Sequence, residues 1–491
     1  MSARIPPPPP LAPVPDRPAP LSTAQARLWF LHTSRPATPE YNLQVALLLR
    51  GRPDREALLA ALGELVRRHE PLRTLVAPRA DGPPVQRVLP GAPPAVDQRP
   101  APGGADVRAA AEAVATQELA HVFDLEREPP LRVRLARPED HRDCLVLVLT
   151  LHHLAFDGSS TGLLMTELAA LYRRFTAQED EEEAADPYAD GDDAPYGAAE
   201  GASPLGPAPR VSYSDYAFWE RETLRRSRDP LLRHWTETLA GAEELTLPTD
   251  REGNGVGGPL GTASYPLTRR TLRQLREVAR QSGATVFAVL LAAYFAVLGR
   301  YGGQREFVVG TPVSGRTDAA LEPLIGCFVN TLCLRASLRE DDTFEALVRR
   351  CHLTLADAVA HQALPFEEVV RALRPARGSD RNPLFRAFCS LAEPPGMPDF
   401  AGHDCALVIP SYALSRFDLN VTFVVEGAAP TLHVEYSELL FDAATADALA
   451  RRLGVFLDWA VARPGRALGD IPWTTPGERR TPPDRLNGSP R

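Results

Sequence analysis

The chain has 491 residues, 44% of them hydrophobic, which is long enough to form two cores. All 54 basic residues are arginines, so the sequence offers no lysine for a Schiff base, a nucleotide-binding P-loop or a general base. The net charge of -9 comes from residues 179–193, which hold nine carboxylates and no arginine. The 54 acidic residues outside this segment balance the 54 arginines. The rest of the chain therefore has no excess positive charge that would favour a nucleic-acid partner.

The first part of the chain predicts a leader followed by an α/β subdomain. Residues 1–20 are proline-rich, and we expect them to be disordered. Helices are expected over residues 24–32 and 55–68. The run CLVLVLTL, residues 144–151, is apolar at nearly every position, which predicts a strand buried on both faces and followed by a short loop and a helix. An N-terminal subdomain is therefore expected over residues 21–176.

The composition then changes to acid, proline and glycine over residues 177–210, which predicts a flexible insertion or linker. Beyond it we expect a second α/β subdomain, residues 211–475, and a disordered tail, residues 476–491. The predicted helices cover residues 214–240, 268–281, 285–300, 342–361, 365–373 and 442–461, and the predicted strands cover residues 306–310, 328–335, 385–391, 418–425 and 431–436.

Cellular location follows from what the sequence contains. The proline run stands where a signal peptide needs an apolar stretch. The longest apolar segment, residues 284–298, is too short to span a bilayer and is expected to be a buried helix. The six cysteines form no CxxC pair and lie among apolar neighbours, which is typical of reduced thiols. We predict a cytoplasmic protein with no membrane partner.

The motif HHLAFDG, at the end of the apolar strand, carries the candidate chemistry. Adjacent strand residues point to opposite faces, so only one of His152 and His153 can face a given cavity. In acyl transfer, a histidine that handles the proton of the nucleophile typically accelerates the reaction by about 10²–10⁴-fold. Asp157 is expected to pair with a buried arginine. Gly158 suits close backbone approach, with its amide near a helix N-terminus where an oxyanion could be stabilised.

Two histidines and an aspartate could alternatively supply most of the ligands of a metal site. The adjacent histidines diverge, however, and the sequence shows no further pattern of the HExxH type. We predict no metal site.

The chain resembles the condensation domains of non-ribosomal peptide synthetases, members of the HHxxxDG acyltransferase superfamily, over roughly residues 20–475. Seven blocks similar to the family motifs occur in order: STAQARLWFLH from Ser22, RRHEPLRT from Arg67, LHHLAFDGSS from Leu151, YSDYAFWE from Tyr213, IGCFVNTLCLR from Ile325, HQALPFEEVV from His361 and SDRNPLF from Ser379. Ala363 departs from the acid that is common in the sixth block, which leaves local substrate contacts open.

The resemblance implies two chloramphenicol-acetyltransferase-like subdomains that form a V-shaped pseudo-dimer with a central tunnel. It also implies a condensation enzyme that joins an acyl or aminoacyl thioester to an amine or alcohol acceptor. The thioester would be carried on the phosphopantetheine of a peptidyl or acyl carrier protein, and the acceptor would be a small molecule or carrier-bound. No tightly bound cofactor is expected. Because the sequence contains no carrier or adenylation motif, we expect a free-standing enzyme that acts in trans.

The same resemblance assigns roles to individual residues. His153 and Gly158 are expected to be catalytic. His152 and Asp157 are expected to be structural parts of the active site. Arg316 is the candidate for the arginine partner of Asp157. Ser314 and Asn330 are candidates for polar residues that line the tunnel.

Other members of the superfamily remain alternatives. An epimerisation domain shares the double histidine, but the first, fifth and seventh blocks favour condensation, and a heterocyclisation domain usually carries a two-aspartate pattern instead. A coenzyme A-dependent O-acyltransferase would leave six blocks unexplained. A non-catalytic module that docks or recruits carrier proteins would be expected to lose the histidines.

Overall fold

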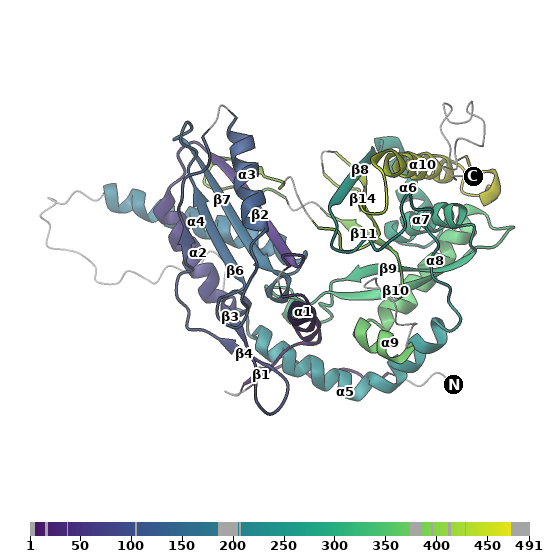
Figure 1. Cartoon of the computed structure of the whole chain (residues 1–491), viewed down its shortest axis with the longest axis horizontal. Helices are drawn as coiled ribbons and strands as arrows, with labels where there is room; N and C mark the ends of the chain where they lie inside the picture. Colours follow the sequence, from purple (N-terminus) through teal and green to yellow (C-terminus); the bar gives the residue numbers. More distant parts are fainter. Residues whose placement is uncertain are drawn as a thin grey trace, which may run out of the picture.

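The computed structural model describes residues 5–14, 18–36, 38–103, 106–184, 205, 208–373, 384–393, 396–410, 414–427 and 429–472. These residues form two α/β subdomains, each with its own large sheet (Figure 1). The strand order is β12-β2-β7-β6-β5 in the N-terminal sheet and β10-β9-β11-β13-β14-β8 in the C-terminal sheet. The predicted architecture of two subdomains is confirmed.

The N-terminal subdomain surrounds a five-stranded sheet. Its strands are β2 (Asn42–Arg50), β5 (Val96–Asp97), β6 (Leu131–Ala136), β7 (Cys144–His152) and β12 (Asp404–Leu407). Its helices are α1 (Thr23–Ser34), α2 (Arg55–Arg68), α3 (Val107–Leu119) and α4 (Ser160–Ala184), with the 3-10 helices η1 (Glu70–Arg73) and η2 (His153–Ala155). A separate small sheet contains β1 (Ala19–Pro20), β4 (Val85–Val88) and β3 (Thr74–Ala77).

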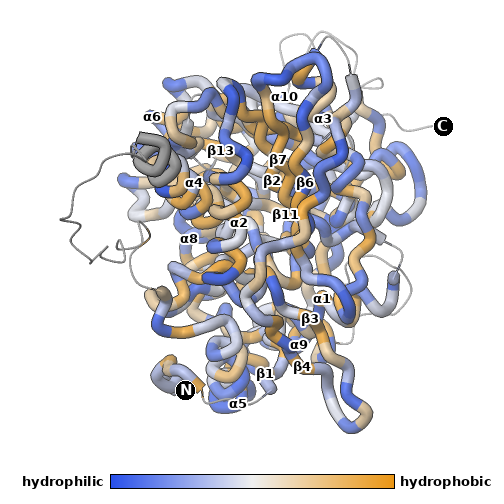
Figure 2. Tube along the Cα trace, turned by 90° about the vertical axis from the view of Figure 1, so that its left-hand side faces the viewer, coloured by the Kyte–Doolittle hydropathy of each residue, from blue (hydrophilic) through white to orange (hydrophobic). Residues whose placement is uncertain are grey.

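Strand β7 lies at the centre of this sheet, paired antiparallel with β2 and β6. All of its residues are buried. Leu147 and Leu149 belong to the core that includes residues of α2 and α4, whereas Val146 and Val148 belong to the core that includes residues of α3. This explains why the sequence is apolar without alternation: side chains that point to opposite faces both enter a core. Figure 2 shows the β2, β7 and β6 region as strongly hydrophobic.

The C-terminal subdomain has a six-stranded sheet covered by helices. Its strands are β8 (Leu260–Pro266), β9 (Glu306–Val313), β10 (Asn330–Ser337), β11 (Ala387–Ala392), β13 (Leu419–Val424) and β14 (Thr431–Ser437). Its helices are α5 (Tyr213–Thr238), α6 (Arg269–Gln281), α7 (Val286–Gly302), α8 (Phe344–Ala360), α9 (Phe366–Leu373) and α10 (Ala443–Ala462), with η3 (Ala319–Leu321) and η4 (Leu468–Asp470). Every helix and strand predicted for this part is present within a few residues of its predicted ends.

Helix α7 corresponds to the apolar segment that was predicted to be a buried helix. The side chain of Thr285 accepts the backbone N–H of Ala288 at its start, and Gly303 ends it in the left-handed conformation, with φ of 64°. Among the described residues, no single helix is both long and apolar enough to cross a bilayer; α6 and α7 meet the length and composition criteria only as a pair, and they are bent by 104°.

The described residues of the proline-rich leader contact α5. The indole N–H of Trp219 donates to the carbonyl of Pro9 at 2.7 Å, and the carboxylate of Asp215 accepts the backbone N–H of Val14 at 2.6 Å. Both partners lie on α5. Residues 5–14 form no regular secondary structure, and these two contacts attach the segment to α5. The predicted tail, residues 476–491, lies outside the described residues.

Two predicted boundaries also need correction. Helix α4 continues to Ala184, into the segment predicted as a linker from residue 177, while residues 185–204 lie outside the described residues. The division at residue 211 is not clean either. Strand β12, from the C-terminal part of the chain, pairs antiparallel with β2 as an edge strand of the N-terminal sheet, with Cys405 opposite Leu49. The chain therefore crosses from one subdomain to the other and back between β11 and β13.

Candidate active site

The two histidines of the motif lie in different environments, as the alternation of strand side chains predicts. His152 is buried, its Nδ1 accepts the backbone N–H of Leu154 at 3.1 Å, and its ring makes edge contacts with His32 and Phe123. His153 begins η2 and is only partly buried, and its backbone N–H donates to the carbonyl of Tyr41 at 2.8 Å. Of the two, His153 is the more exposed residue.

Both imidazoles are neutral near pH 7. Burial, followed by the charges of nearby groups, lowers the pKa of His152 to about 3. Burial and then the positive charge of Arg416 lower the pKa of His153 to about 4, although the Asp157 carboxylate opposes this shift. A neutral imidazole has one nitrogen with a free lone pair, so His153 can accept a hydrogen from a nucleophile.

The thiol of Cys327 contacts His153, with 3.6 Å between Sγ and Nδ1. Burial, followed by the charge of Asp157, raises the pKa of Cys327 well above its ordinary value, so the group is a thiol and not a thiolate. Nε2 of His153 can accept a proton in the tautomer in which Nδ1 carries the hydrogen and donates it to the sulfur of Cys327. No role was predicted for the cysteines, and only the position of Cys327 inside the fifth block pointed to this one.

The predicted ion pair between Asp157 and Arg316 is present. Arg316 Nη1 lies 3.0 Å from Asp157 Oδ2, and both side chains are buried. The same carboxylate accepts the backbone N–H of Phe328 at 3.0 Å and the backbone N–H of Ser160, the first residue of α4, at 2.9 Å. Asp157 therefore fixes the loop after His153 to α4 on one side and to the C-terminal subdomain on the other.

Gly158 follows Asp157 at the start of α4 and is exposed. A Cβ at this position would meet no protein atom within 4 Å, and the backbone does not have the positive φ that favours glycine. The protein itself thus gives no steric reason for a glycine here, in contrast to Gly315, whose added Cβ would lie 2.0 Å from the carbonyl oxygen of Phe328. If glycine is needed at position 158, the reason lies in what approaches from outside.

The two residues predicted to line the tunnel lie in different surroundings. Asn330 directs its side-chain amide to the carbonyls of Gln362 and Leu364, both at 2.8 Å, and its Oδ1 accepts the backbone N–H of Phe366 at 3.2 Å. It holds the fifth and sixth blocks together, so its polar atoms are occupied by the protein. Ser314 is exposed at the end of β9. Its contact with substrate stays a prediction.

Further contacts join other sequence blocks next to His153. The hydroxyl of Tyr213, in the fourth block, lies 2.9 Å from Ser22 Oγ in the first block and donates to the carbonyl of Cys327 in the fifth at 2.5 Å. A Cβ on Gly326 would lie 2.3 Å from the ring of Tyr213. Arg27 Nε, in the first block, lies 2.8 Å from Glu367 Oε1 in the sixth. The residues that surround the histidine are therefore brought together from distant parts of the chain.

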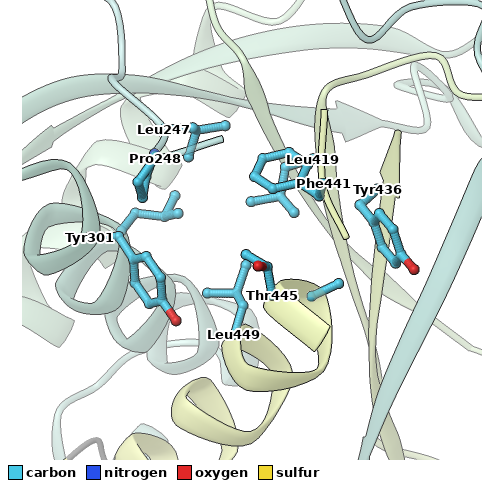
Figure 3. Close-up of a pocket in the computed structure, with 10 residues that line it drawn as sticks. Leu247, Pro248, Tyr301, Leu419, Tyr436, Phe441, Thr445 and Leu449 are labelled. Carbon is cyan, nitrogen blue, oxygen red and sulfur yellow. The ribbon is translucent and has the colours of Figure 1, made fainter. Parts of the chain in front are cut away.

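Two of the cavities among the described residues bear on the location of the site. One, of about 70 Å³, adjoins the His153 region and is lined by Pro39, Glu40, Asn42, Leu119, Ala120, Leu414 and Arg416. The other, of about 20 Å³, lies in the C-terminal subdomain between α7, α10 and the sheet, with Tyr301, Phe441 and Leu449 in its wall (Figure 3). A space of that size holds about one water molecule, so it is no acyl-binding site.

One group of potential metal ligands occurs in the described part of the chain: His234 on α5, with Asp357 and His361 on α8 or just after it. The two imidazoles are stacked, with centroids 3.4 Å apart and planes inclined by 4°. Imidazole lone pairs lie in the ring plane, so one ion cannot lie in both planes unless a ring turns. The arrangement favours a stacked pair beside a carboxylate over a metal centre.

Comparison with known proteins gives a consistent result over most of the chain. A model of the condensation domain matches residues 16–190 and 195–481. The probable non-canonical nonribosomal peptide synthetase CymA of Salinispora arenicola is 36% identical over 482 residues, which are 95% of this chain and 6% of CymA. Phosphinothricin tripeptide synthetase PhsC of Streptomyces viridochromogenes is 35% identical over 488 residues, 96% of this chain and 42% of PhsC. The chain thus spans less than half of either relative.

Solved structures have the same fold. The X-domain from teicoplanin biosynthesis has a TM-score of 0.79 and 28% identity, and the match covers 94% of this chain and 99% of the X-domain. The first condensation domain of the CDA synthetase has a TM-score of 0.74 and covers 94% of this chain and 100% of that domain; at 21% identity it supports the fold alone.

Proposed function

Because the chain belongs to the condensation-domain family, which forms amide bonds, we propose that it joins an acyl or aminoacyl group from a carrier-bound thioester to an amine or alcohol acceptor. The observation that carries this proposal is the neutral, partly buried imidazole of His153 at the end of β7. It is held on its backbone side by Tyr41 and followed by a loop that the Asp157–Arg316 pair fixes.

In the proposed reaction the nucleophile attacks the carbonyl carbon of the thioester, so that a C–N or C–O bond forms and the C–S bond breaks. His153 Nε2 accepts the proton that the nucleophile loses, and the departing pantetheine sulfur takes up a proton to leave as a thiol. Because the thioester is already activated, no ATP is needed, and positioning together with one proton acceptor supplies the catalysis.

The start of α4 is the proposed site for the negative charge that develops on the carbonyl oxygen. The backbone N–H groups of Ser160 and Thr161 already donate to Asp157 and Gly158, so the donor proposed for this oxygen is the backbone N–H of Gly158, which open space adjoins. Asp157, occupied by Arg316, Phe328 and Ser160, is proposed to position this loop and not to act on the substrate.

The proposed partners are carrier proteins with a phosphopantetheine arm, because the relatives that match along nearly the whole chain are synthetases. We further propose that the carrier is a separate polypeptide and that the enzyme acts in trans in natural-product biosynthesis. Coenzyme A as the direct donor is less well supported, since the family match extends far beyond the histidine motif.

The test is reconstitution with carrier proteins encoded beside the gene. Each carrier is loaded with an acyl phosphopantetheine and incubated with the purified protein and an amine or alcohol, and the product is measured by mass spectrometry. A new amide or ester formed by the wild-type protein, and strongly reduced with His153→Ala, would support the proposal. Equal rates with and without the protein, over all carriers and acceptors, would contradict it.

A second candidate function is recruitment of another protein. The X-domain from teicoplanin biosynthesis, which has the same fold, has been solved in a complex with OxyB. It is 27% identical to this chain, and the match covers 95% of this chain. A recruiting module would bind its partner equally well as wild type and as His153→Ala and would form no new bond. The retained His153 favours catalysis over this alternative.

A further inference from the structure

Arg416 connects the two subdomains beside His153. It lies between β12, which belongs to the N-terminal sheet, and β13, which belongs to the C-terminal sheet. Its neighbours are anchored in the C-terminal subdomain: the backbone N–H of Ser415 donates to the carbonyl of Gly258 at 2.9 Å, and Asp418 forms an ion pair with Arg386 at 2.7 Å. The backbone of Arg416 is therefore held by one subdomain.

The guanidinium of Arg416 reaches the other subdomain. Its Nε donates to the carbonyl of Glu40 and its Nη2 to the carbonyl of Asn42, both at 3.2 Å. The carbonyl between these two, that of Tyr41, accepts the backbone N–H of His153 at 2.8 Å. Three consecutive carbonyls are thus shared between Arg416 and His153, with Arg416 on the outer two and His153 on the middle one.

From this geometry we infer that Arg416 is a positioning residue for His153, because it fixes the tripeptide that holds the histidine backbone. The position of the imidazole therefore depends on how the C-terminal subdomain packs against the N-terminal subdomain. The inference rests on the proposed function only for its effect on turnover. The claim that Arg416 holds the backbone of His153 in place does not depend on a substrate.

The charge of Arg416 adds an electrostatic consequence. The charged groups that act on His153 are Arg416 and Arg27, which lower its pKa, and Asp157, which raises it. Arg416 itself is desolvated, which lowers its own pKa, and among the described residues no carboxylate forms an ion pair with it, because Glu40 pairs with Arg35 at 3.2 Å. Its field at His153 is therefore not cancelled by a direct partner.

Two substitutions separate geometry from charge. Lysine keeps the charge, but a single ammonium group cannot reproduce a planar fork that donates from two nitrogens. Methionine removes the charge at similar length. Arg305→Met is a matched control, since Arg305 is an exposed arginine that pairs with the exposed Glu340. Folding of each variant is checked by circular dichroism.

The experiment combines NMR titration of the His153 ring with single-turnover condensation. In Arg416→Met the titration midpoint of His153 should rise from about 4 towards the ordinary 6.5, and the rate should fall about tenfold or more. Arg416→Lys should titrate like wild type and still react more slowly, because the tripeptide is less well held. If Arg416→Met does not fold, the rate of Arg416→Lys still tests the positioning role.

An unchanged titration midpoint in folded Arg416→Met, or wild-type rates in both variants, would overturn the inference. A wild-type protein that catalyses no condensation would contradict the proposed function, and the positioning role would then be decided by the NMR resonance of the His153 backbone N–H, which should shift in Arg416→Lys and stay at its wild-type position if Arg416 does not hold the tripeptide.

Discussion

Asp157 and Arg316 come from different subdomains and form an ion pair at 3.0 Å, with side chains only 2% and 8% exposed. Removing one member of such a pair leaves a charge without its partner in a buried place. The pair is therefore a sensitive point for stability as well as for the loop after His153.

Asp157→Ala is predicted to lower the free energy of unfolding by about 3–5 kcal/mol, with a loss of soluble yield. Chemical denaturation measures the change. Asp404→Ala is the matched control: Asp404 pairs with Arg50 at 2.9 Å but is 72% exposed, so the loss should stay below about 1 kcal/mol. Equal stability of Asp157→Ala and wild type would mean that the side chain is solvent-facing or directly catalytic, and not that it holds the loop.

His153→Ala is predicted to reduce single-turnover condensation by about 10²–10⁴-fold while folding and carrier affinity stay nearly intact. The loss should be larger with an alcohol than with an amine, because a neutral alcohol needs its proton removed. His152→Ala should lower stability more than the rate of the folded fraction, since the ring is buried against His32 and Phe123. A stable but inactive His152→Ala beside an active His153→Ala would invert the assignment.

Cys327→Val is predicted to slow single-turnover condensation by about two- to tenfold, because the thiol contact with His153 Nδ1 is a weak hydrogen bond worth about 0.5–1.5 kcal/mol. Cys327→Ser, which keeps a polar contact, should lose less. The pH profile of the rate distinguishes this role from a packing defect. A catalytic nucleophile would instead lose nearly all activity in both variants, and that outcome would replace our interpretation.

Gly158→Ala is predicted to fold with wild-type stability, within about 0.5 kcal/mol, because the added methyl group meets no protein atom. If a substrate approaches this backbone closely, condensation should nevertheless fall by about tenfold or more. Thermal melting and single-turnover rates measure the two effects separately. A fully active Gly158→Ala would show that the oxyanion is stabilised elsewhere.

Stability should decrease as the pH falls from about 6.5 towards 4. The folded chain keeps His152 and His153 unprotonated, with pKa values of about 3 and 4, whereas both take up protons near 6.5 when unfolded. The unfolded state then binds more protons, and each histidine contributes about 1.4 kcal/mol per pH unit in this window. Urea denaturation between pH 7 and 5 tests this, and His153→Gln should show a shallower slope than wild type.

The sequence predicted many but not all of the longer elements: β2, α3 and β8 were missed. The unbroken apolar run of β7 and the helical spacing of α2 and α10 identify the elements without any tertiary information. The short edge strands β5 and β12 were not predicted, because two to four residues carry no periodicity and their pairing depends on strands far away in the chain.

The candidate site was likewise predicted only where a sequence motif marks its residues. His153 and the Asp157–Arg316 pair were found from the motif and from the family resemblance. Cys327 and Arg416 were missed because their importance comes from contacts with residues that are 174 and more than 370 positions away. Asn330 was predicted to line the tunnel, and the donation of its amide to the carbonyls of Gln362 and Leu364 could not be read from any local pattern.

The crossing of β12 into the N-terminal sheet has a consequence for synthesis on the ribosome. Most residues of the N-terminal sheet emerge before residue 152, yet its edge strand emerges only after residue 404. Until then, the outer edge of β2 has unpaired N–H and C=O groups, a surface on which other chains can add as strands. The N-terminal subdomain therefore depends on late translation to close its sheet, and fragments that end before residue 404 should aggregate more readily than the full chain.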